Sequence, residues 1–405
     1  MLNAYIYDGL RSPIGRHAGS LSSVRPDDLA ATVIKNLLEK TGIPAADVED
    51  VIFGSTNQAG EDSRNVARFA ALLAGMPVTV PGQTVNRLCA SGLGAVIDSA
   101  RAITAGEGEL YIAGGVESMT RAPFVMGKAE SAYSRDAKIY DTTIGTRFPN
   151  RKFTDQFGAH SMPETGDNVA EEFGISREQA DTFAAASQAK YQAAKEAGFF
   201  DGEITPIEVS QGRKLPPKLV TEDEHPRPSS TFEALSKLKP LFEGGVVTAG
   251  NASGINDGAA ALIIGSEKVQ EQYGLKPLAR ILSSAAAGIE PRIMGAGPIE
   301  AIKKAVQRAG LTLDDMDIIE INEAFASQVL SCLKGLDVAL DDPRVNPNGG
   351  AIAIGHPLGC SGARLALTVA RQLQRTGKKY AVISLCIGLG QGLAMVIENP
   401  EAATS

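Results

Sequence analysis

The chain has 405 residues, which is enough for two or three domains with full cores. Its net charge of −8 argues against nucleic-acid binding, and its 43% hydrophobic content is that of an ordinary globular protein. No run is long and apolar enough to predict a membrane span, and the N-terminus has no signal-peptide pattern. We therefore expect a cytoplasmic chain whose four cysteines are reduced.

The first third of the chain predicts an α/β unit. A strand is followed by an amphipathic helix that closes on a glycine and by a buried strand, and then come a glycine-rich loop, a helix and an apolar strand. In chain order these elements lie at 1–8, 27–42, 47–55, 87–94, 95–105 and 110–114.

The stretch from 118 to 242 has a different character, with more charge, more proline and fewer apolar runs. One helix is expected at 177–197. We interpret the stretch as an inserted loop domain of the kind that often shapes a ligand site. The first half resumes at 246–264.

The last third repeats the first, with corresponding elements at 298–310, 314–322, 355–376 and 380–385. The same offset separates Asp47 from Asp314 and Cys89 from His356, so Cys89 and His356 occupy equivalent loops. We expect two similar α/β halves with mostly parallel sheets, whose functional loops converge at the carboxyl ends of the strands. The expected divisions are an N-terminal half at 1–117 and 243–272, the inserted loop domain at 118–242, and a C-terminal half at 273–405.

A nucleophile and a base are suggested by these two loops. Cys89 precedes a helix whose first backbone amides are unpaired, and those N–H groups and the helix dipole favour a thiolate. His356, one of four histidines, could accept the proton of Cys89. The alternatives are a small buried thiol and a solvated histidine in a turn.

Two more positions could carry chemistry. Asn322 ends a strand, where its amide could position water, stabilise an oxyanion or cap the next helix. Cys386 lies in a loop with three glycines, where its thiol could act as a general acid or base, or be a plain buried thiol. Cys332 and Cys360 are expected to be packing residues, and the cysteine spacing predicts no metal site.

Four motifs in this order resemble the thiolase family: LCASG at 88–92, NEAF at 322–325, GHPLG at 355–359 and CIGLGQG at 386–392. The likeness covers nearly the whole chain. It implies an α/β thiolase fold, in which two βαβαβαββ halves form a five-layered αβαβα arrangement with an inserted loop domain. It also implies CoA thioester substrates, coenzyme A as a co-substrate with no covalently bound cofactor, and a homotetramer formed as a dimer of dimers.

The resemblance implies a role for each motif. Cys89 would attack the 3-oxo carbon of a 3-oxoacyl-CoA, His356 would activate the thiol, and Cys386 would protonate the departing acetyl-CoA carbanion. A second CoA would then take the acyl group. One oxyanion hole would use His356 and a water held by Asn322, and the other the backbone amides of Cys89 and Gly388. Carbon–carbon cleavage does need a covalent acyl carrier and a separate proton donor, which two thiols and a histidine can supply.

By position, the resemblance also implies a pantetheine pocket and a basic residue near the adenosine end of CoA. Arg227 matches the basic residue, in a variable segment. The residues that match the pocket are Ser253, Met162, Ala324 and Phe325. From the residues alone, the glycine-rich segment around Ser253 could contact an extended ligand or form a tight turn.

Within the family, the stretches at 57–68, 118–126 and 162–165 resemble 3-oxoadipyl-CoA thiolases of aromatic catabolism. One loop departs from that group, because the tryptophan expected before Arg147 is absent and the chain has none. A dicarboxylic acyl chain needs a cation at its far end, for which Arg147, Arg151 and Lys152 are candidates. A solvated basic turn is the alternative.

Other activities are alternative interpretations of the same sequence. Acetoacetyl-CoA thiolase (acetyl-CoA C-acetyltransferase) and medium-chain 3-ketoacyl-CoA thiolase of β-oxidation share the same motifs. A ketoacyl synthase would lack a second cysteine at the position of Cys386. A non-catalytic CoA- or lipid-binding protein would be expected to have lost Cys89, His356 or Cys386, and all three are present.

Overall fold

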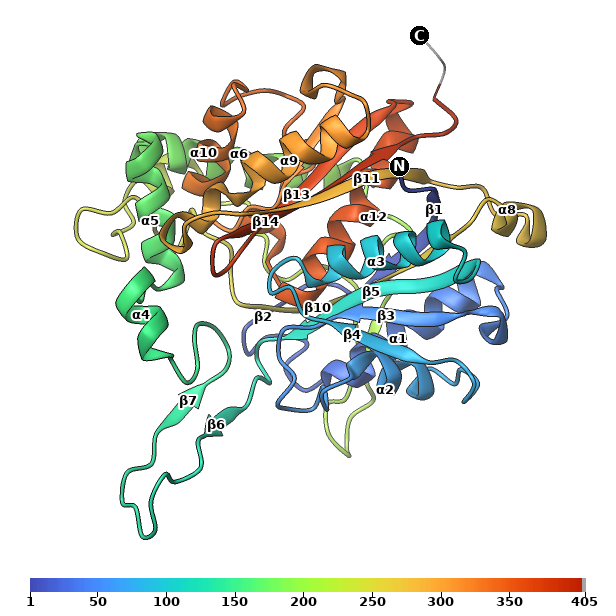
Figure 1. Cartoon of the computed structure of the whole chain (residues 1–405), viewed down its shortest axis with the longest axis horizontal. Coiled ribbons are helices and arrows are strands. Elements are labelled where there is room, and N and C mark those ends of the chain that lie inside the picture. Colours follow the sequence, from blue (N-terminus) through green and yellow to red (C-terminus); the bar gives the residue numbers. More distant parts are fainter. Residues whose placement is uncertain (403–405) are drawn as a thin grey trace.

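The computed structural model describes residues 1–402 and shows a large mixed sheet with helices in three layers (Figure 1). The N-terminal half contains the strands β1 (Ala4–Arg11), β2 (Gly15–Arg16), β3 (Asp50–Gly54), β4 (Gly82–Val85), β5 (Leu110–Ser118) and β10 (Asn256–Gly265). Its helices are α1 (Pro26–Thr41), α2 (Val66–Leu73) and α3 (Ser91–Ala105), and α8 (Lys268–Tyr273) leads to the next half.

The C-terminal half contains the strands β11 (Ala279–Gly288), β12 (Ile318–Ile321), β13 (Tyr380–Ile387) and β14 (Gln391–Glu398). Its helices are α9 (Gly297–Arg308), α10 (Ala326–Gly335), α11 (Ala351–Ile354) and α12 (Leu358–Thr376). Between the halves lie β6 (Phe124–Met126), β7 (Ile139–Asp141), α4 (Arg151–Phe157), α5 (Met162–Phe173), α6 (Arg177–Glu196), β8 (Ile207–Val209), β9 (Lys218–Val220) and α7 (Phe232–Leu235). Short 3-10 turns lie at Ala45–Asp47, Pro291–Ala296 and Leu313–Asp315.

The internal repeat is confirmed by the strand order. The N-terminal strands lie in the order β4-β3-β5-β10-β1 and the C-terminal strands in the order β12-β13-β14-β11. Each C-terminal strand thus has the place of its N-terminal counterpart. The place of β4 is marked by a single parallel bridge between Ile319 and Val345. A short pairing of β1 with β11 joins the two sets of strands into one sheet.

The expectation of mostly parallel sheets is wrong. Parallel pairing is found for β3 with β4 and β5, and for β12 with β13. The pairs β1–β10, β10–β5, β11–β14 and β13–β14 are antiparallel. The last strand of each half causes this, because it returns against its neighbour instead of crossing over through a helix, as in the tight turn from β13 to β14.

The five-layered αβαβα arrangement is confirmed, and the central layer explains why two helices are so apolar. Helices α3 and α12 pack against each other and against strands of both halves, whereas α1 and α9 cover the outer faces (Figure 1). Accordingly α12 is buried from Gly359 to Ala370, while α9 is amphipathic, with Ile302 buried and Lys303 exposed. The N-termini of both central helices lie at the carboxyl ends of the strands.

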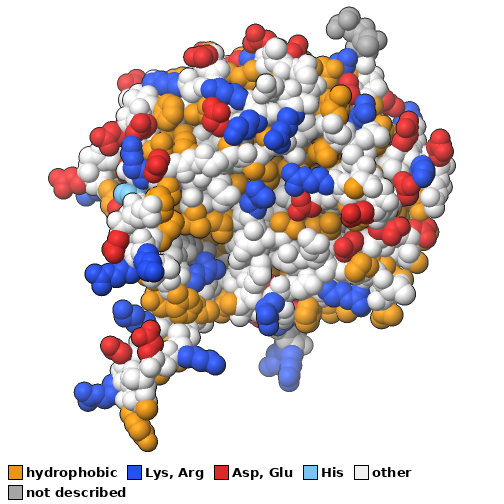
Figure 2. Space-filling model, in the orientation of Figure 1, with side chains coloured by type: hydrophobic (Ala, Val, Ile, Leu, Met, Phe, Trp, Pro, Cys, Tyr) orange, Lys and Arg blue, Asp and Glu red, His pale blue; other side chains and the backbone are white. Residues whose placement is uncertain are grey.

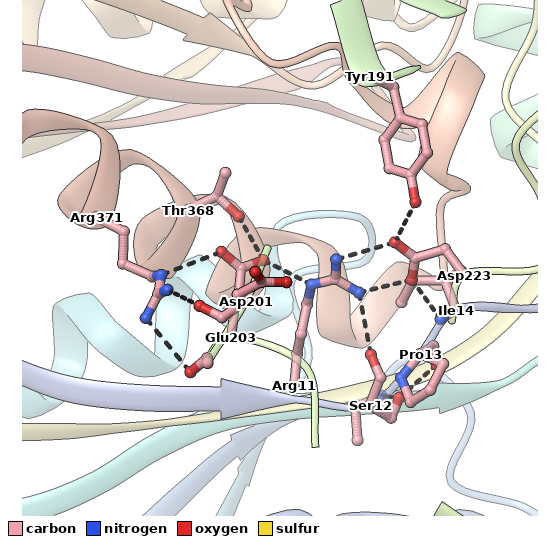
Figure 3. A network of polar contacts seen from close by, with 12 residues as sticks. Arg11, Ser12, Pro13, Ile14, Tyr191, Asp201, Glu203, Asp223, Thr368 and Arg371 are labelled. Carbon is pink, nitrogen blue, oxygen red and sulfur yellow. Dashed lines mark hydrogen bonds and ion pairs between the residues drawn. The ribbon is translucent and has the colours of Figure 1, made fainter. Parts of the chain in front are cut away.

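The inserted segment is anchored to the central layer by a buried ionic network (Figure 3). Arg11, at the end of β1, donates to Glu203 at 2.6 Å and to both carboxylate oxygens of Asp223 at 2.7 and 3.0 Å. Thr368 of α12 donates to Glu203, and Tyr191 of α6 donates to Asp223. Because each charge has partners, the network can stay buried. It holds the insertion against the helix that begins beside His356.

None of the helices within residues 1–402 combines the length and the apolar character needed to span a bilayer.

Candidate active site

The N-termini of α3 and α12 meet at the centre of the molecule and bring the loops of Cys89 and His356 together. Their approach depends on glycines: a Cβ atom at Gly92 would lie 2.5 Å from the carbonyl oxygen of Gly359, and one at Gly362 would lie 2.3 Å from a backbone nitrogen of α3. The equivalent loops of the two halves therefore face each other across the pair of central helices.

Cys89 is a half-buried residue whose sulfur faces two backbone amides. The N–H groups of Gly388 and of Cys89 itself stabilise its charged form, but desolvation outweighs them and raises the pKa of Cys89 to about 11. The backbone amides thus favour the thiolate, as expected from the sequence, but burial has the larger effect in the free protein. The preceding residue, Leu88, has a φ of 46°, a left-handed backbone conformation that is unfavourable for leucine. This conformation shapes the turn that leads into Cys89.

His356 is buried and its ring is fixed at both nitrogens. Nδ1 lies 2.6 Å from Ser361 Oγ, and this hydroxyl donates to the Pro357 carbonyl at 2.9 Å. Because the hydroxyl proton is used there, Nδ1 must carry the hydrogen, and Nε2 is left as the base. Burial, with the positive charge of Arg364, lowers the pKa of His356 to about 3, so the ring is neutral.

Asn322 follows β12 directly and is buried. Its Nδ2 lies 3.4 Å from His356 Nε2, and its Oδ1 has no hydrogen-bond partner among residues 1–402. Helix α10 begins at Ala326 after a cap at Phe325, so the alternative interpretation of Asn322 as a helix cap is wrong. The amide faces the ring of His356 instead.

Cys386 lies on β13, near its end, rather than in the glycine loop where the sequence suggested it. The side chain is fully buried, and burial together with the nearby Cys89 raises the pKa of Cys386 well above its ordinary value. The thiol therefore holds its proton until a stronger base appears. The tight turn that follows brings the Gly388 amide to the sulfur of Cys89.

Four of the five expected CoA-binding residues lie together. Ala324 and Phe325 belong to the same apolar cluster as Cys386, and Met162 packs against it. The Ser253 N–H donates to the Ala324 carbonyl at 3.0 Å. Arg227 is separate: it is exposed, and its backbone N–H donates to Gln188 at 2.9 Å.

The three expected cations for the acyl tail are not part of this cluster. Arg147 is half-buried and donates to the carbonyl of Gly145, in its own loop, at 3.2 Å. The side chain of Arg151 is 92% exposed and pairs with Asp155, and Lys152 is exposed. Within residues 1–402, no hydrogen bond or ion pair connects any of the three cations with Cys89, His356, Asn322 or Cys386.

Sequence reasoning missed three residues that support His356. Ser361 fixes its tautomer, and Asn256 and Glu117 hold its loop, as described below. The signal for Ser361 was its position one turn into the helix after His356. The signal for Glu117 was its position near the end of an apolar strand, because a charged residue is rarely buried without a bonding partner.

A half-buried thiol facing two amides, a neutral imidazole with a free Nε2 and a second, fully protonated thiol define a cysteine-based acyl-transfer site. The thiolase N-terminal domain matches residues 4–268, and the thiolase C-terminal domain matches residues 275–399. The chain belongs to the thiolase family and is an acyltransferase of that family.

Individual relatives resemble this chain along nearly its full length. The chain is 57% identical to a β-ketoadipyl-CoA thiolase of Acinetobacter baylyi, over 98% of this chain and 100% of the relative. It is 56% identical to the 3-oxoadipyl-CoA/3-oxo-5,6-dehydrosuberyl-CoA thiolase of Escherichia coli, with the same coverage. Among solved structures, the acetyl-CoA acetyltransferase of Bacillus anthracis superposes with a TM-score of 0.91 at 40% identity, covering 98% of this chain and 99% of that one.

Proposed function

We propose that this thiolase cleaves 3-oxoadipyl-CoA with CoA to succinyl-CoA and acetyl-CoA, and so serves aromatic catabolism. β-Ketoadipyl and 3-oxoadipyl are two names for the same acyl group, and this group appears in the names of relatives at 55–57% identity over nearly the whole chain. The observation that carries the chemistry is the approach of the Cys89 loop to the His356 loop at Gly92 and Gly359, with Cys386 close to Cys89.

In the first half-reaction, Cys89 attacks the 3-oxo carbon while His356 Nε2 takes its proton. Because neither group is charged beforehand, the proton moves as the carbon–sulfur bond forms. The backbone amides of Cys89 and Gly388 hold the resulting oxyanion, since both already face the sulfur. Collapse breaks the C2–C3 bond, and Cys386 gives its proton to C2, which releases acetyl-CoA and leaves succinyl on Cys89.

In the second half-reaction, a CoA thiol gives its proton to the Cys386 thiolate and attacks the succinyl carbonyl. The bond to Cys89 breaks, and Cys89 recovers its proton from His356. In the first half-reaction, the imidazolium Nε2–H and a water held by Asn322 stabilise the enolate oxygen of the departing acetyl-CoA unit. The Oδ1 of Asn322, which has no hydrogen-bond partner among residues 1–402, supports this role. Every catalytic group returns to its starting state.

CoA binding is assigned to the pocket around Ser253, Met162, Ala324 and Phe325. This assignment is supported by the apolar cluster in which Ala324 and Phe325 pack together with Cys386, the proposed proton donor. Arg227 is placed at the adenosine end, where an exposed cation suits a phosphate.

The acyl-tail hypothesis concerns Arg147, which is the only half-buried member of the three cations. If it binds the distal carboxylate, Arg147→Ala should lower kcat/KM for 3-oxoadipyl-CoA by about tenfold to hundredfold, because a charge-assisted hydrogen bond contributes about 1.5–3 kcal/mol. Turnover of acetoacetyl-CoA should stay within twofold. A thiolysis panel with these two substrates and a medium-chain 3-ketoacyl-CoA is the measurement.

The matched control is Arg135→Ala, an exposed arginine between β6 and β7. It should leave kcat/KM unchanged for both substrates. Equal losses on both substrates in Arg147→Ala would reject the carboxylate role, and faster wild-type turnover of acetoacetyl-CoA or of the medium-chain substrate would reject the 3-oxoadipyl assignment.

A homotetramer, formed as a dimer of dimers, is part of the proposal. Two separate apolar surfaces support it: the outer face of α2 beside the edge strand β4, with Phe69, Leu73 and Val78 exposed, and the β6–β7 hairpin, with Phe124 and Met126 exposed. The hairpin extends from the body, and apolar side chains are visible along this extension (Figures 1 and 2). Light scattering should give about four times the 42.3 kDa of one chain, and a stable monomer would contradict the proposal.

We assign the working compartment to the cytoplasm, because the mechanism needs Cys89 and Cys386 as free thiols. Cell fractionation would test this, and secretion of the active enzyme would contradict it. The proposed domain division keeps 118–242 as an insertion, which its separate anchoring to Arg11 supports.

A further inference from the structure

The loop that carries His356 belongs to the C-terminal half, but side chains of the N-terminal half hold its backbone. The His356 N–H donates to Asn256 Oδ1 at 3.0 Å, and the Gly359 N–H donates to Glu117 Oε2 at 2.9 Å. Asn256 begins β10 and Glu117 lies near the end of β5, and these strands are antiparallel neighbours. Adjacent strands thus present one acceptor each to the same loop.

Both acceptors are buried and are held in place by further bonds. Glu117 also accepts from the backbone N–H groups of Thr56 and Asn57, at 3.0 and 3.1 Å. Asn256 donates through Nδ2 to the Gly15 carbonyl at 2.9 Å, and the same nitrogen lies 3.3 Å from His225 Nδ1. Removing either acceptor would leave a buried N–H unpaired, which is costly.

Steric contact leaves the loop little freedom on these strands. A Cβ atom at Gly355, where φ is +110°, would lie 2.6 Å from Cγ of Asn256. A Cβ atom at Gly359 would lie 2.4 Å from the Val116 carbonyl oxygen. Two glycines therefore let the loop lie directly on β5 and β10.

We propose that Glu117 and Asn256 are positioning residues that set the place of His356 relative to Cys89. Helix α3, which follows Cys89, packs on β3 and β5. The clamp formed by Glu117 and Asn256 holds the His356 loop on β5 and β10, and both of these strands also contact α3. The position of His356 relative to Cys89 is therefore set by strands of the N-terminal half. A displacement of about 1 Å can cost about a hundredfold in rate. The inference rests on the proposed roles of Cys89 and His356 and not on the identity of the acyl chain.

The test compares kcat and KM for Glu117→Gln and Asn256→Ala, with 3-oxoadipyl-CoA and with acetoacetyl-CoA. The glutamine keeps the size of Glu117 but turns one acceptor position into a donor that faces a backbone N–H. We expect kcat to fall by about tenfold to hundredfold in each variant on both substrates, with KM for CoA within about threefold. Asn256→Asp keeps an acceptor for the His356 N–H and should recover part of the lost kcat.

The matched control is Asp317→Ala, which removes the acceptor for the backbone N–H groups of Lys379 and Tyr380 at the start of β13. It should leave kcat within twofold. Values of kcat within threefold of wild type in folded Glu117→Gln or Asn256→Ala, or losses matched by Asp317→Ala, would overturn the clamp. Thermal unfolding identifies the folded variants. If Glu117→Gln fails to fold, the comparison of Asn256→Ala with Asn256→Asp tests the proposal. If His356→Ala keeps full turnover, the proposed roles fail instead.

Discussion

Cys386→Ala is expected to abolish carbon–carbon cleavage while the enzyme keeps its acyl-transfer chemistry. The departing carbanion of acetyl-CoA needs a proton, and the buried, protonated thiol of Cys386 is placed to supply it. Loss of a general acid should lower kcat for thiolysis by about 10²–10⁴-fold. In exchange of labelled CoA into acetyl-CoA through Cys89, Cys386 only handles the proton of the CoA thiol, which water can also accept because a thiol is far more acidic than C2 of acetyl-CoA. Exchange should therefore stay within about tenfold of wild type.

Cys332→Ala provides the matched control for this experiment. Cys332 is also fully buried, but its thiol donates to the Gly295 carbonyl within the packing of α10. Its loss should cost stability and leave both reactions nearly unchanged. If Cys386→Ala lost exchange and cleavage equally, Cys386 would not be the proton donor, and if it retained cleavage, the proposed mechanism would be wrong.

His356→Ala is expected to lower kcat for both half-reactions by about 10²–10⁴-fold, because the proposed base for Cys89 is removed. The loss should differ from that of Cys386→Ala in one respect. CoA exchange should fall together with cleavage, since every acyl transfer to Cys89 begins with the same proton movement. Retention of exchange in this variant would contradict the assignment of His356 as the base for Cys89.

The pH dependence of Cys89 alkylation by iodoacetamide checks where that proton lies in the free enzyme. The pKa of Cys89 is raised to about 11 and the pKa of His356 is lowered to about 3, so neither group titrates between pH 6 and 9. The thiolate fraction, and with it the alkylation rate, should rise about tenfold per pH unit over this range. A pH-independent rate would instead show a preformed thiolate–imidazolium pair.

The repeat was the part of the fold that the sequence predicted best. Apolar runs, helix-closing glycines and the shared offset of Cys89 and His356 were enough to pair the loops of the two halves. Strand direction was predicted wrongly, because a return strand and a crossover strand have the same apolar pattern. The position of Cys386 was missed for a related reason: glycines after a strand mark a turn, but not the residue at which the strand ends.

The candidate site likewise contains residues that the sequence predicted and residues that it did not. Cys89, His356, Asn322 and Cys386 were identified from the sequence, because their chemistry resides in the residue types and in four motifs. Ser361, Glu117 and Asn256 were not, because each acts through a bond to a backbone or ring atom whose partner is known only after folding. The acyl-tail cations lie in the loop at Arg147 and in the first turn of α4, where neither motif nor packing selects one.

The sequence by itself therefore predicted which groups would react, since nucleophile, base and proton donor are properties of side chains. The tertiary structure alone decided how those groups are charged and held. Burial makes Cys89 a neutral thiol and His356 a neutral base, against the effect of the helix N-terminus, because desolvation depends on every segment that surrounds the site. The clamp from Glu117 and Asn256 likewise exists only where two halves of the chain meet.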